Sequence, residues 1–382
     1  MIVPVVAPLL PSSSKFLQSY LTRSPPPPSL LIDTLSSSTI GITLNLPKSF
    51  NALNHTQVSY LSPLYAHLLS ESTPPYVIFK GADTGKKTKS FCSGGDVVQI
   101  YKEGLIRYQN LGDKSTLNNV DGTDIFFRDE YKLNNLISNF KSQISIWDGI
   151  CMGGGVGLSI HGSHRVSTSR TVFAMPESGI GLFPDVGGSA WMPGLGGWGI
   201  YLGVTGERVK GETARRLGLS TCHVGDWESV EEKVIERLDG GEDAGEVLAS
   251  VDEGGDERGA LDDLIDECFE GKFQIGEIFE ALEKSEHGEA ERIKGIIETK
   301  SPTSVEVTLE QLRRGKSMSS ISDCLEMEFN ISQAMMQEPN GDFYEGIRAV
   351  LVDKDGAPKW DKGFGEVEVE KYFREAEEKW TP

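Results

Sequence analysis

The sequence predicts an α/β fold that is followed by a mainly helical region. Between residues 39 and 226, short apolar stretches typical of strands alternate with stretches of helical periodicity, and glycine clusters follow two of the strand candidates. After Asp226 the chain is dense in Glu and Asp, with apolar residues such as Leu261 and Leu264 at helical spacing. We therefore expect an α/β core at 39–226 and a helical region at 227–382.

The elements of the core are expected in a definite order. Regular structure should begin near Thr39, because apolar residues at 40, 42, 44 and 46 alternate with small or polar ones, which is the period of a half-buried strand. The further expected elements are a buried strand at 76–79, a polar loop at 117–124, a helix at 126–140, a strand at 144–147 that runs into the second glycine cluster, and a short strand at 172–174.

Residues 1–32 differ in composition from the rest of the chain. They contain Lys15 and Arg23 but no Asp or Glu, serines are frequent, and four prolines stand at 25–28. An acid-poor, Ser-rich and basic N-terminus is typical of an organelle transit peptide. We expect the mitochondrion as the compartment, although the composition alone does not distinguish it from another organelle. The alternative is a disordered tail that carries no address.

The composition excludes several classes of function. With 38% apolar and 25% charged residues, the chain of 382 residues can bury a core. Its formal charge of -20 repels phosphates, so we expect no nucleic acid and no anionic membrane surface among its partners, and an anionic ligand would need a local basic patch. No apolar run is long enough to span a membrane.

The cysteines and histidines give no sign of a metal centre. The five cysteines are widely spaced without a CxxC pair, and the six histidines form no HxxxH or HExxH pattern. This pattern favours a reducing compartment, with no disulfide framework and no metal site.

Two glycine-rich turns are the first candidates for a site. Ser93-Gly94-Gly95-Asp96 and Gly153-Gly154-Gly155 each follow a predicted strand, and the second precedes a predicted helix. The spacing does not fit a dinucleotide fingerprint. Each cluster alone could be an ordinary tight turn. Two backbone N–H donors from separate turns, however, would form an oxyanion hole for a carbonyl under attack.

Two carboxylates lie in an apolar segment rich in Gly and Pro. Glu177 precedes Asp185 by eight positions, and Ile180, Leu182 and Phe183 stand between them. A carboxylate in apolar surroundings resists ionisation, and its raised pKa suits a base, a nucleophile or an acid. The alternative, two exposed loop charges, fits the apolar neighbours less well.

A third carboxylate is expected on a helix face. Phe126, Glu130, Leu133 and Ile137 share one face at helical spacing, so Glu130 should point inward with the apolar stripe, whereas Asp129 should be solvated. A helix offset by one residue would remove this prediction. A buried carboxylate is costly unless it is paired or functional, which makes Glu130 a site candidate.

Three lysines stand just before the first glycine turn, at positions 86, 87 and 89. In so acidic a chain they suggest an anchor for a ligand phosphate. A solvated loop explains them equally well.

Taken together, these segments resemble the crotonase (enoyl-CoA hydratase/isomerase) superfamily. The resemblance extends from about residue 39 to about residue 372 and is most specific in 173–188 and near the C-terminus. The segments that carry it are 47–54, 93–96, 127–131, 153–155, 173–188, 301–304 and 342–355.

The resemblance implies a spiral of β-β-α units, with the site between the two glycine turns. It places the oxyanion N–H groups on Gly95 and Gly154 and the attack on Glu177, with Asp185 beside it. Whether Glu177 attacks the carbonyl directly or activates a water stays open. The acyl-CoA substrate would be contacted by Lys48, Asn51, Ala52, Glu130, Gly154, Glu177 and Asp185.

One position separates the reaction types of the superfamily. Hydratases carry a second catalytic Glu shortly after the three glycines, and the matching residue here is Gly157. The chain also departs from the family at Asp148, where a His is usual. The missing carboxylate favours a thioester hydrolase over a hydratase.

The resemblance therefore implies hydrolysis of short β-hydroxyacyl-CoA thioesters, such as 3-hydroxyisobutyryl-CoA in valine catabolism. Coenzyme A would enter as part of the substrate, with no separate cofactor and no metal. A homo-oligomer is compatible with these features without being predicted by them. Two alternatives stay open: an enoyl-CoA hydratase or isomerase, and a non-catalytic structural subunit of a mitochondrial ribosome.

Overall fold

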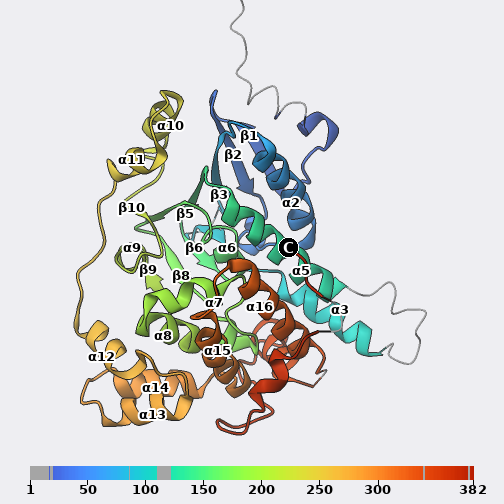
Figure 1. Cartoon of the computed structure of the whole chain (residues 1–382), viewed down its shortest axis with the longest axis vertical. Coiled ribbons are helices and arrows are strands. Elements are labelled where there is room, and N and C mark those ends of the chain that lie inside the picture. The colour runs from blue at the N-terminus through green and yellow to red at the C-terminus, as the bar shows by residue number, and fades with distance from the viewer. Residues whose placement is uncertain (1–16, 18–19, 86, 110–121, 339, 377–378) are drawn as a thin grey trace, which may run out of the picture.

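A computed structural model gives the fold (Figure 1) and describes residues 17, 20–85, 87–109, 122–338, 340–376 and 379–382. Its centre is formed by two β-sheets. The larger sheet has the strand order β1-β2-β3-β5-β7-β10, in which β1 and β2 pair antiparallel and the other neighbours pair parallel. Its strands are β1 (Leu30–Thr34), β2 (Thr39–Leu44), β3 (Tyr76–Gly81), β5 (Gln143–Trp147), β7 (His164–Thr168) and β10 (Cys222–Val224).

The smaller sheet has the order β4-β6-β8-β9. Its first three strands pair parallel, and β8 pairs antiparallel with β9. The strands are β4 (Ser90–Cys92), β6 (Ile150–Met152), β8 (Val172–Ala174) and β9 (Val209–Lys210). Consecutive strands β3 and β4, β5 and β6, and β7 and β8 enter different sheets, which is the expected spiral of β-β-α units.

The chain changes sheets between β5 and β6 at Gly149. Gly149 has φ +101°, and a Cβ there would collide with the Lys89 carbonyl, so the corner requires glycine. The strand predicted at 144–147 therefore does not run directly into the glycine cluster. The separate strand β6 intervenes and delivers that cluster to the smaller sheet.

Helices of the core cover the sheets. The helix α2 (His55–Ser70) begins with a reciprocal cap, because Asn54 Oδ1 accepts from Gln57 N at 3.0 Å and Gln57 Oε1 accepts from Asn54 N at 2.9 Å. The other core helices are α3 (Val97–Gln109), α5 (Gly122–Asn139), α6 (Gly154–Gly157), α7 (Gly188–Trp191), α8 (Gly197–Thr205) and α9 (Gly211–Arg216). Short 3₁₀ turns are η1 (Pro47–Ser49), η2 (Glu177–Ile180) and η3 (Met192–Leu195).

The region after residue 226 is helical, as expected. It consists of α10 (Glu231–Asp239), α11 (Ala244–Ala249), α12 (Ala260–Phe269), α13 (Ile275–Lys284), α14 (Ala290–Glu298), α15 (Pro302–Gly315), α16 (Ile321–Met336) and α17 (Asp342–Ile347), followed by the π-type turn η4 (Arg348–Val352) and the 3₁₀ turn η5 (Val369–Phe373).

These helices pack in two places. The first pair, α10 and α11, packs against the larger sheet, where Val234 and Leu238 meet Ile78, Ile144 and Val166. The helices α12, α15 and α16 share one apolar core with α5, α7 and α8. Figure 1 shows α16 lying across the middle of the molecule beside α5 and α7.

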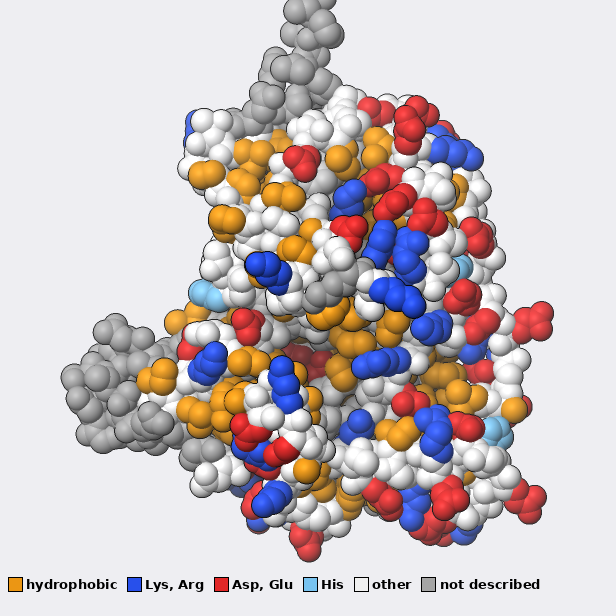
Figure 2. Space-filling view, turned by 180° about the vertical axis from the view of Figure 1, so that it is seen from behind, with side chains coloured by type: hydrophobic (Ala, Val, Ile, Leu, Met, Phe, Trp, Pro, Cys, Tyr) orange, Lys and Arg blue, Asp and Glu red, His pale blue; other side chains and the backbone are white. Residues whose placement is uncertain are grey.

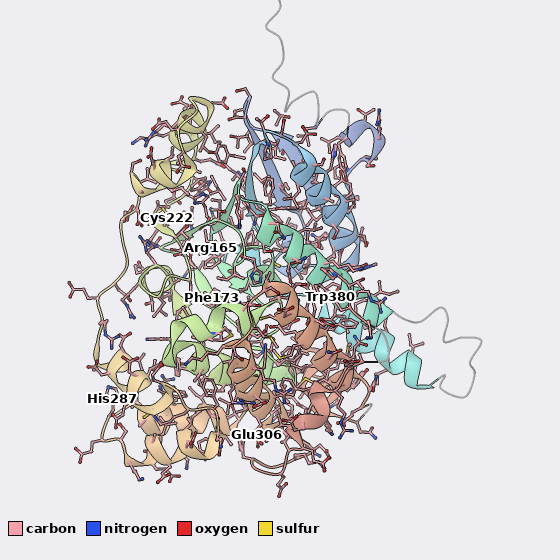
Figure 3. All side chains as sticks on the ribbon, viewed as in Figure 1. Arg165, Phe173, Cys222, His287, Glu306 and Trp380 are labelled. Atoms are coloured by element: carbon pink, nitrogen blue, oxygen red, sulfur yellow. The ribbon has the colours of Figure 1, made fainter. Side chains whose placement is uncertain are left out.

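The last described residues return to α5. Trp380 is buried, and its Nε1 donates to the Arg128 carbonyl at 3.3 Å. Figure 3 labels Trp380 beside this helix, and Phe173 of β8 in the centre of the molecule. The C-terminal region thus covers the helix that carries Glu130.

Two expectations about boundaries are wrong. Regular structure begins before Thr39, because β1 (Leu30–Thr34) pairs along β2 and buries Leu30, so the leader expected at 1–32 overlaps the fold. Residues 1–16 lie outside the described part. The polar loop expected at 117–124 is cut short, because α5 already begins at Gly122 and residues 110–121 are not described.

Among the described residues, no helix is both long enough and apolar enough to cross a bilayer.

Candidate active site

The two glycine turns lie side by side. Strands β4 and β6 pair parallel; β6 ends directly before Gly153, and one residue separates the end of β4 from Gly94. Gly94 and Gly153 have φ values of +111° and +49°, which favour glycine. A Cβ placed on Gly154 would lie 3.2 Å from the Gly95 nitrogen, so the two predicted donors are close neighbours.

The N–H groups of both predicted oxyanion donors, Gly95 and Gly154, take no part in the backbone hydrogen bonds of the described residues around them. Gly95 forms a β-bridge with Leu53, but the bridge uses the N–H groups of Leu53 and Asp96, which bond to Gly94 O and Leu53 O at 2.8 Å each. Gly154 is the first residue of α6, and the first N–H groups of a helix have no acceptor within it. Two adjacent backbone donors therefore remain for a ligand oxygen.

Three carboxylates surround these turns. Glu130 lies on α5, Glu177 begins η2 and is separated by two residues from the end of β8, and Asp185 lies in the loop before α7. A Cβ on Gly154 would be 2.5 Å from Glu130 Oε1, and a Cβ on Gly153 would be 2.8 Å from Glu177 Oε1. The two glutamates thus flank the second glycine turn, with Glu130 at Gly154 and Glu177 at Gly153.

The carboxylates are almost completely buried, which decides between a site and exposed loop charges. Glu130, Glu177 and Asp185 are 2%, 5% and 4% exposed. Tyr131 Oη donates to Asp185 Oδ2 at 2.9 Å. Within the described part of the chain, Glu130 Oε1 and Glu177 Oε2 have no hydrogen-bond partner. Unsatisfied carboxylate oxygens at a glycine turn are what a substrate-binding site requires.

The electrostatics of the cluster follow from burial and from like charge. Burial raises the pKa of Glu177 well above its ordinary range, and the Asp185 charge raises it further. The pKa of Glu130 is raised in the same way, by burial and by the charges of Asp185 and Glu177. Burial raises the pKa of Asp185 to about 7, against the lowering effect of the Tyr131 hydrogen bond. The three groups cannot all ionise easily, so the cluster keeps protons more readily than exposed carboxyl groups do.

The predicted CoA-contact segment runs along the first glycine turn. Lys48 and Ala52 are exposed and half-buried, respectively. The Asn51 side chain is buried, accepting from Leu46 N at 3.1 Å and donating to Ala82 O and Ser90 O at 2.9 Å each. Because backbone groups occupy this amide, Asn51 fixes the segment, and a ligand contact there would use its backbone.

Of the three lysines suggested as phosphate anchors, Lys89 is already paired with carboxylates. Lys89 Nζ lies 2.7 Å from Glu228 Oε1 and 3.3 Å from Asp148 Oδ2, and Asp148 also pairs with Arg170 at 2.7 Å. The departure at Asp148 is thereby explained, because its carboxylate joins two cations. Lys87 is exposed, and residue 86 lies outside the described part.

The structure also explains the missing second carboxylate. A Cβ on Gly157 would lie 2.6 Å from Val186 Cβ and 3.0 Å from Asn134 Nδ2. No side chain fits this position without moving the loop that carries Asp185.

Sequence reasoning missed three polar side chains around the carboxylates. Tyr131 follows Glu130 and binds Asp185, as described above. Asn134 is buried one helical turn after Glu130, and both its amide atoms lack a partner among the described residues. Glu328 on α16 is fully buried behind the Asp185 loop. Like Glu130, Glu328 is a carboxylate in an apolar helical stripe, but it lies outside the segments that carry the family resemblance.

Comparison with known proteins gives the family. The family model described as enoyl-CoA hydratase/isomerase matches residues 39–373. The chain belongs to this family. The resemblance inferred from the glycine turns and the 173–188 segment is thereby confirmed, and so is the fold. No group of three or more His, Cys, Asp or Glu able to hold a metal occurs in the described ranges.

Curated relatives match this chain over most of its length. The chain is 41% identical to a mitochondrial 3-hydroxyisobutyryl-CoA hydrolase of Dictyostelium discoideum, over 84% of both chains. It is 38% identical to the protein of that name from Danio rerio, over 88% of this chain and 87% of the other. The corresponding human protein is 37% identical over 84% of this chain and 81% of its own.

Solved structures share the whole architecture. A structure titled carnitinyl-CoA dehydratase from Mycobacterium thermoresistibile superposes with a TM-score of 0.78 at 31% identity, covering 92% of this chain and 98% of its own. A structure titled enoyl-CoA hydratase from Rhodobacter sphaeroides has a TM-score of 0.76 at 29% identity, covering 91% and 97%. The C-terminal helices are therefore part of a fold shared with these proteins.

Proposed function

We propose that the protein hydrolyses 3-hydroxyisobutyryl-CoA and related short β-hydroxyacyl-CoA thioesters in mitochondria, as a step of valine catabolism. The observation that carries this proposal is the cluster of three buried carboxylates around two adjacent backbone N–H donors. The names of the curated relatives supply the substrate and the compartment, and the site geometry supplies the chemistry.

In the proposed mechanism the thioester oxygen accepts from the N–H groups of Gly95 and Gly154. As attack begins, negative charge develops on that oxygen, and preorganised donors stabilise it. Glu177 either attacks the carbonyl carbon or takes a proton from the water that does so. The C–S bond then breaks, and the leaving thiolate takes a proton, so that CoA departs as a thiol.

The other two carboxylates would bind the acyl group. Asp185 and Glu130 face the same space. Each can accept a hydrogen bond from the β-hydroxyl when it is ionised, or donate its proton to the hydroxyl oxygen when it is protonated. A site built to bind a hydroxyl rejects the analogue that lacks it, because its buried polar groups are then unpaired. We therefore expect a strong preference for β-hydroxyacyl chains.

The charge distribution supports an anionic substrate despite the acidic composition. Figure 2 shows Lys and Arg side chains gathered around a hollow, with acidic side chains at its floor and hydrophobic ones on its walls. Cations at the rim would hold the phosphates of CoA, while the buried carboxylates meet the acyl end. No cofactor beyond the CoA of the substrate is needed for this chemistry.

A thiol-release assay tests the proposal. Purified protein is expected to release CoA from 3-hydroxyisobutyryl-CoA far faster than from isobutyryl-CoA, and Glu177→Gln is expected to lose about a thousandfold or more in kcat, since the nucleophile or base is removed. Glu236→Gln, an exposed position on α10, is the matched control and should keep its activity. Near-normal rates for Glu177→Gln would overturn the assignment.

An isotope experiment can establish the direct route. In a single turnover in ¹⁸O-water, label in the Glu177 carboxyl group requires an anhydride that water opens at the Glu177 carbonyl. Label in the product alone arises both from attack of water on the thioester and from an anhydride opened at the acyl carbonyl. Trapping with hydroxylamine then separates the two routes, because a hydroxamate on Glu177 forms only from the anhydride.

The titles of the solved structures make hydration of an enoyl-CoA the second candidate. The lack of room for a side chain at Gly157 speaks against it, because the second acid/base of that reaction has no place. A crotonyl-CoA hydration assay separates the two reactions.

A further inference from the structure

The loop that carries Asp185 has a strained backbone. Val186 has φ +52°, a left-handed conformation that β-branched residues rarely adopt, and Gly187 follows with φ +82°. Such a conformation persists only when the surroundings fix it. The position of the Asp185 carboxylate depends on this turn, since Asp185 immediately precedes it.

Glu328 of α16 provides most of the fixing contacts. Its Oε2 accepts from Gly187 N at 2.6 Å, and its Oε1 accepts from Ser189 N at 2.9 Å and from Ser189 Oγ at 2.6 Å. Gln311 Nε2 donates to Glu328 Oε1 at 3.1 Å and to Pro184 O at 2.7 Å. The carboxylate thus spans the loop from one end of the strained turn to the other.

The opposite side of the turn is held by His161. Its Nε2 donates to the Val186 carbonyl at 2.7 Å. The strained residue is therefore bound by one side chain on its carbonyl side and by Glu328 on the N–H of the next residue.

Only an acceptor without hydrogens satisfies the Glu328 position. Four donors point at its two oxygens, and an ionised carboxylate offers about four acceptor sites. A glutamine would turn its NH₂ group toward N–H donors. The side chain is fully buried, and its hydrogen-bond partners among the described residues are these four neutral donors. A buried charge held by donors alone is costly, which points to a role beyond packing.

Glu328 also lies within the electrostatic reach of the site. Tyr131, which donates to Asp185, has its pKa raised by burial first and then by the charges of Asp185, Glu328 and Glu130. Burial raises the pKa of Glu328 itself to about 7, and the Asp185 charge adds to this.

We propose that Glu328 is a positioning residue for Asp185, and that through the 184–189 loop it determines selectivity for acyl chains with a β-hydroxyl. This inference rests on the proposed function, in which Asp185 meets that hydroxyl. Glu328 does not itself touch the substrate.

The test compares Glu328→Gln with Glu326→Gln, an exposed glutamate on the same helix. For Glu328→Gln, kcat/KM on 3-hydroxyisobutyryl-CoA should fall about 10- to 100-fold, since small displacements of a positioned group cost that much. On isobutyryl-CoA, which has no hydroxyl to place, the loss should be within about threefold. Glu326→Gln should match the wild type on both. Equal losses on both substrates would overturn the proposal.

The double variant decides whether the effect passes through Asp185. In an Asp185→Asn background, Glu328→Gln should cause little further loss, because the positioned carboxylate is already gone. A full additional loss would refute the positioning role. If Glu328→Gln does not fold, Ser189→Ala removes one of its donors and should produce the same substrate-selective loss at smaller amplitude. A loss on both substrates alike, or no loss, would contradict the proposal.

Hydrogen exchange tests the positioning without relying on catalysis. The amides of Gly187 and Ser189 should exchange faster in Glu328→Gln than in the wild type, while those of β5 should not change. If the wild type hydrolyses none of the thioesters, the proposed function fails, and exchange still tests the loop contact. Unchanged exchange at both amides would refute the contact as well.

Discussion

Replacing Asp185 by Asn should change how the stability of the folded protein depends on pH. The wild-type carboxyl group has an ordinary pKa of 3.8, which burial raises to about 7 in the fold. Below pH 3.8 both the folded and unfolded states hold the proton, and the group adds no penalty. As the pH rises from there to about 7, the unfolded chain loses its proton while the folded chain keeps it, so stability falls.

The size of the effect follows from the shift in pKa. Each unit corresponds to about 1.4 kcal/mol, so the group withdraws about 4 kcal/mol of stability across its whole window. Between pH 5 and pH 8, the range in which unfolding of the protein can be measured, the loss of stability is about 2–3 kcal/mol. Asn does not titrate, so the variant escapes this loss.

Urea unfolding, followed by circular dichroism at pH 5, 6, 7 and 8, measures how the free energy of unfolding depends on pH. The free energy of unfolding of Asp185→Asn, relative to wild type, should rise by about 2–3 kcal/mol across that range. Asp33→Asn, an exposed position on β1, should show no such trend. A difference between Asp185→Asn and wild type that is constant with pH would refute the reasoning, because it would mean that Asp185 ionises as easily in the fold as in the unfolded chain.

Three other substitutions give further predictions. Gly154→Ala keeps the backbone N–H but places a methyl group 2.5 Å from Glu130 Oε1, so the carboxylate or the turn must move and kcat should fall about 10²-fold with unchanged circular dichroism; normal turnover would contradict a catalytic requirement for this close packing. Tyr131→Phe removes the hydrogen bond that lowers the pKa of Asp185, so the acid limb of the kcat/KM profile should move upward by about 0.5–1 pH unit; an unmoved limb would count against ionised Asp185 in the reaction. Gly157→Glu should destabilise the fold in thermal unfolding and give no crotonyl-CoA hydration, and a stable variant with hydratase activity would disprove the steric argument.

The site was predictable where its residues stand in short motifs. Two glycine turns, a carboxylate pair in an apolar segment and a glutamate in a helical stripe are local patterns, and the fold brings Glu130, Glu177 and Asp185 together as expected. Glu328 carried the same local signal as Glu130. Its meaning depends on the N–H groups of Gly187 and Ser189, roughly 140 positions earlier, and no local pattern reports such a contact.

The fold was less visible in the details of its strands. The strands β6 and β9 have three and two residues, too few to show an alternating pattern. The strand β1 lies in a Ser- and Pro-rich stretch whose composition resembles a leader. Lys89 was one of three lysines that suggested a phosphate anchor, and no local pattern could show that it pairs with Glu228, 139 positions away along the chain. The errors therefore have three causes: strands too short to show a period, a strand hidden by its composition, and an ion pair between residues distant in sequence.

The contacts of α16 and Trp380 with the site have a consequence for biosynthesis. Every proposed catalytic residue is translated before position 190, whereas Glu328 and Trp380, which hold the Asp185 loop and cover α5, come from the last fifth of the chain. A growing polypeptide therefore carries three acidic side chains that lack their covering helix, and it exposes the apolar faces of α5 and α8 during that interval. Completion of the site is therefore expected late in folding, after α16 has packed on the Asp185 loop and Trp380 on α5.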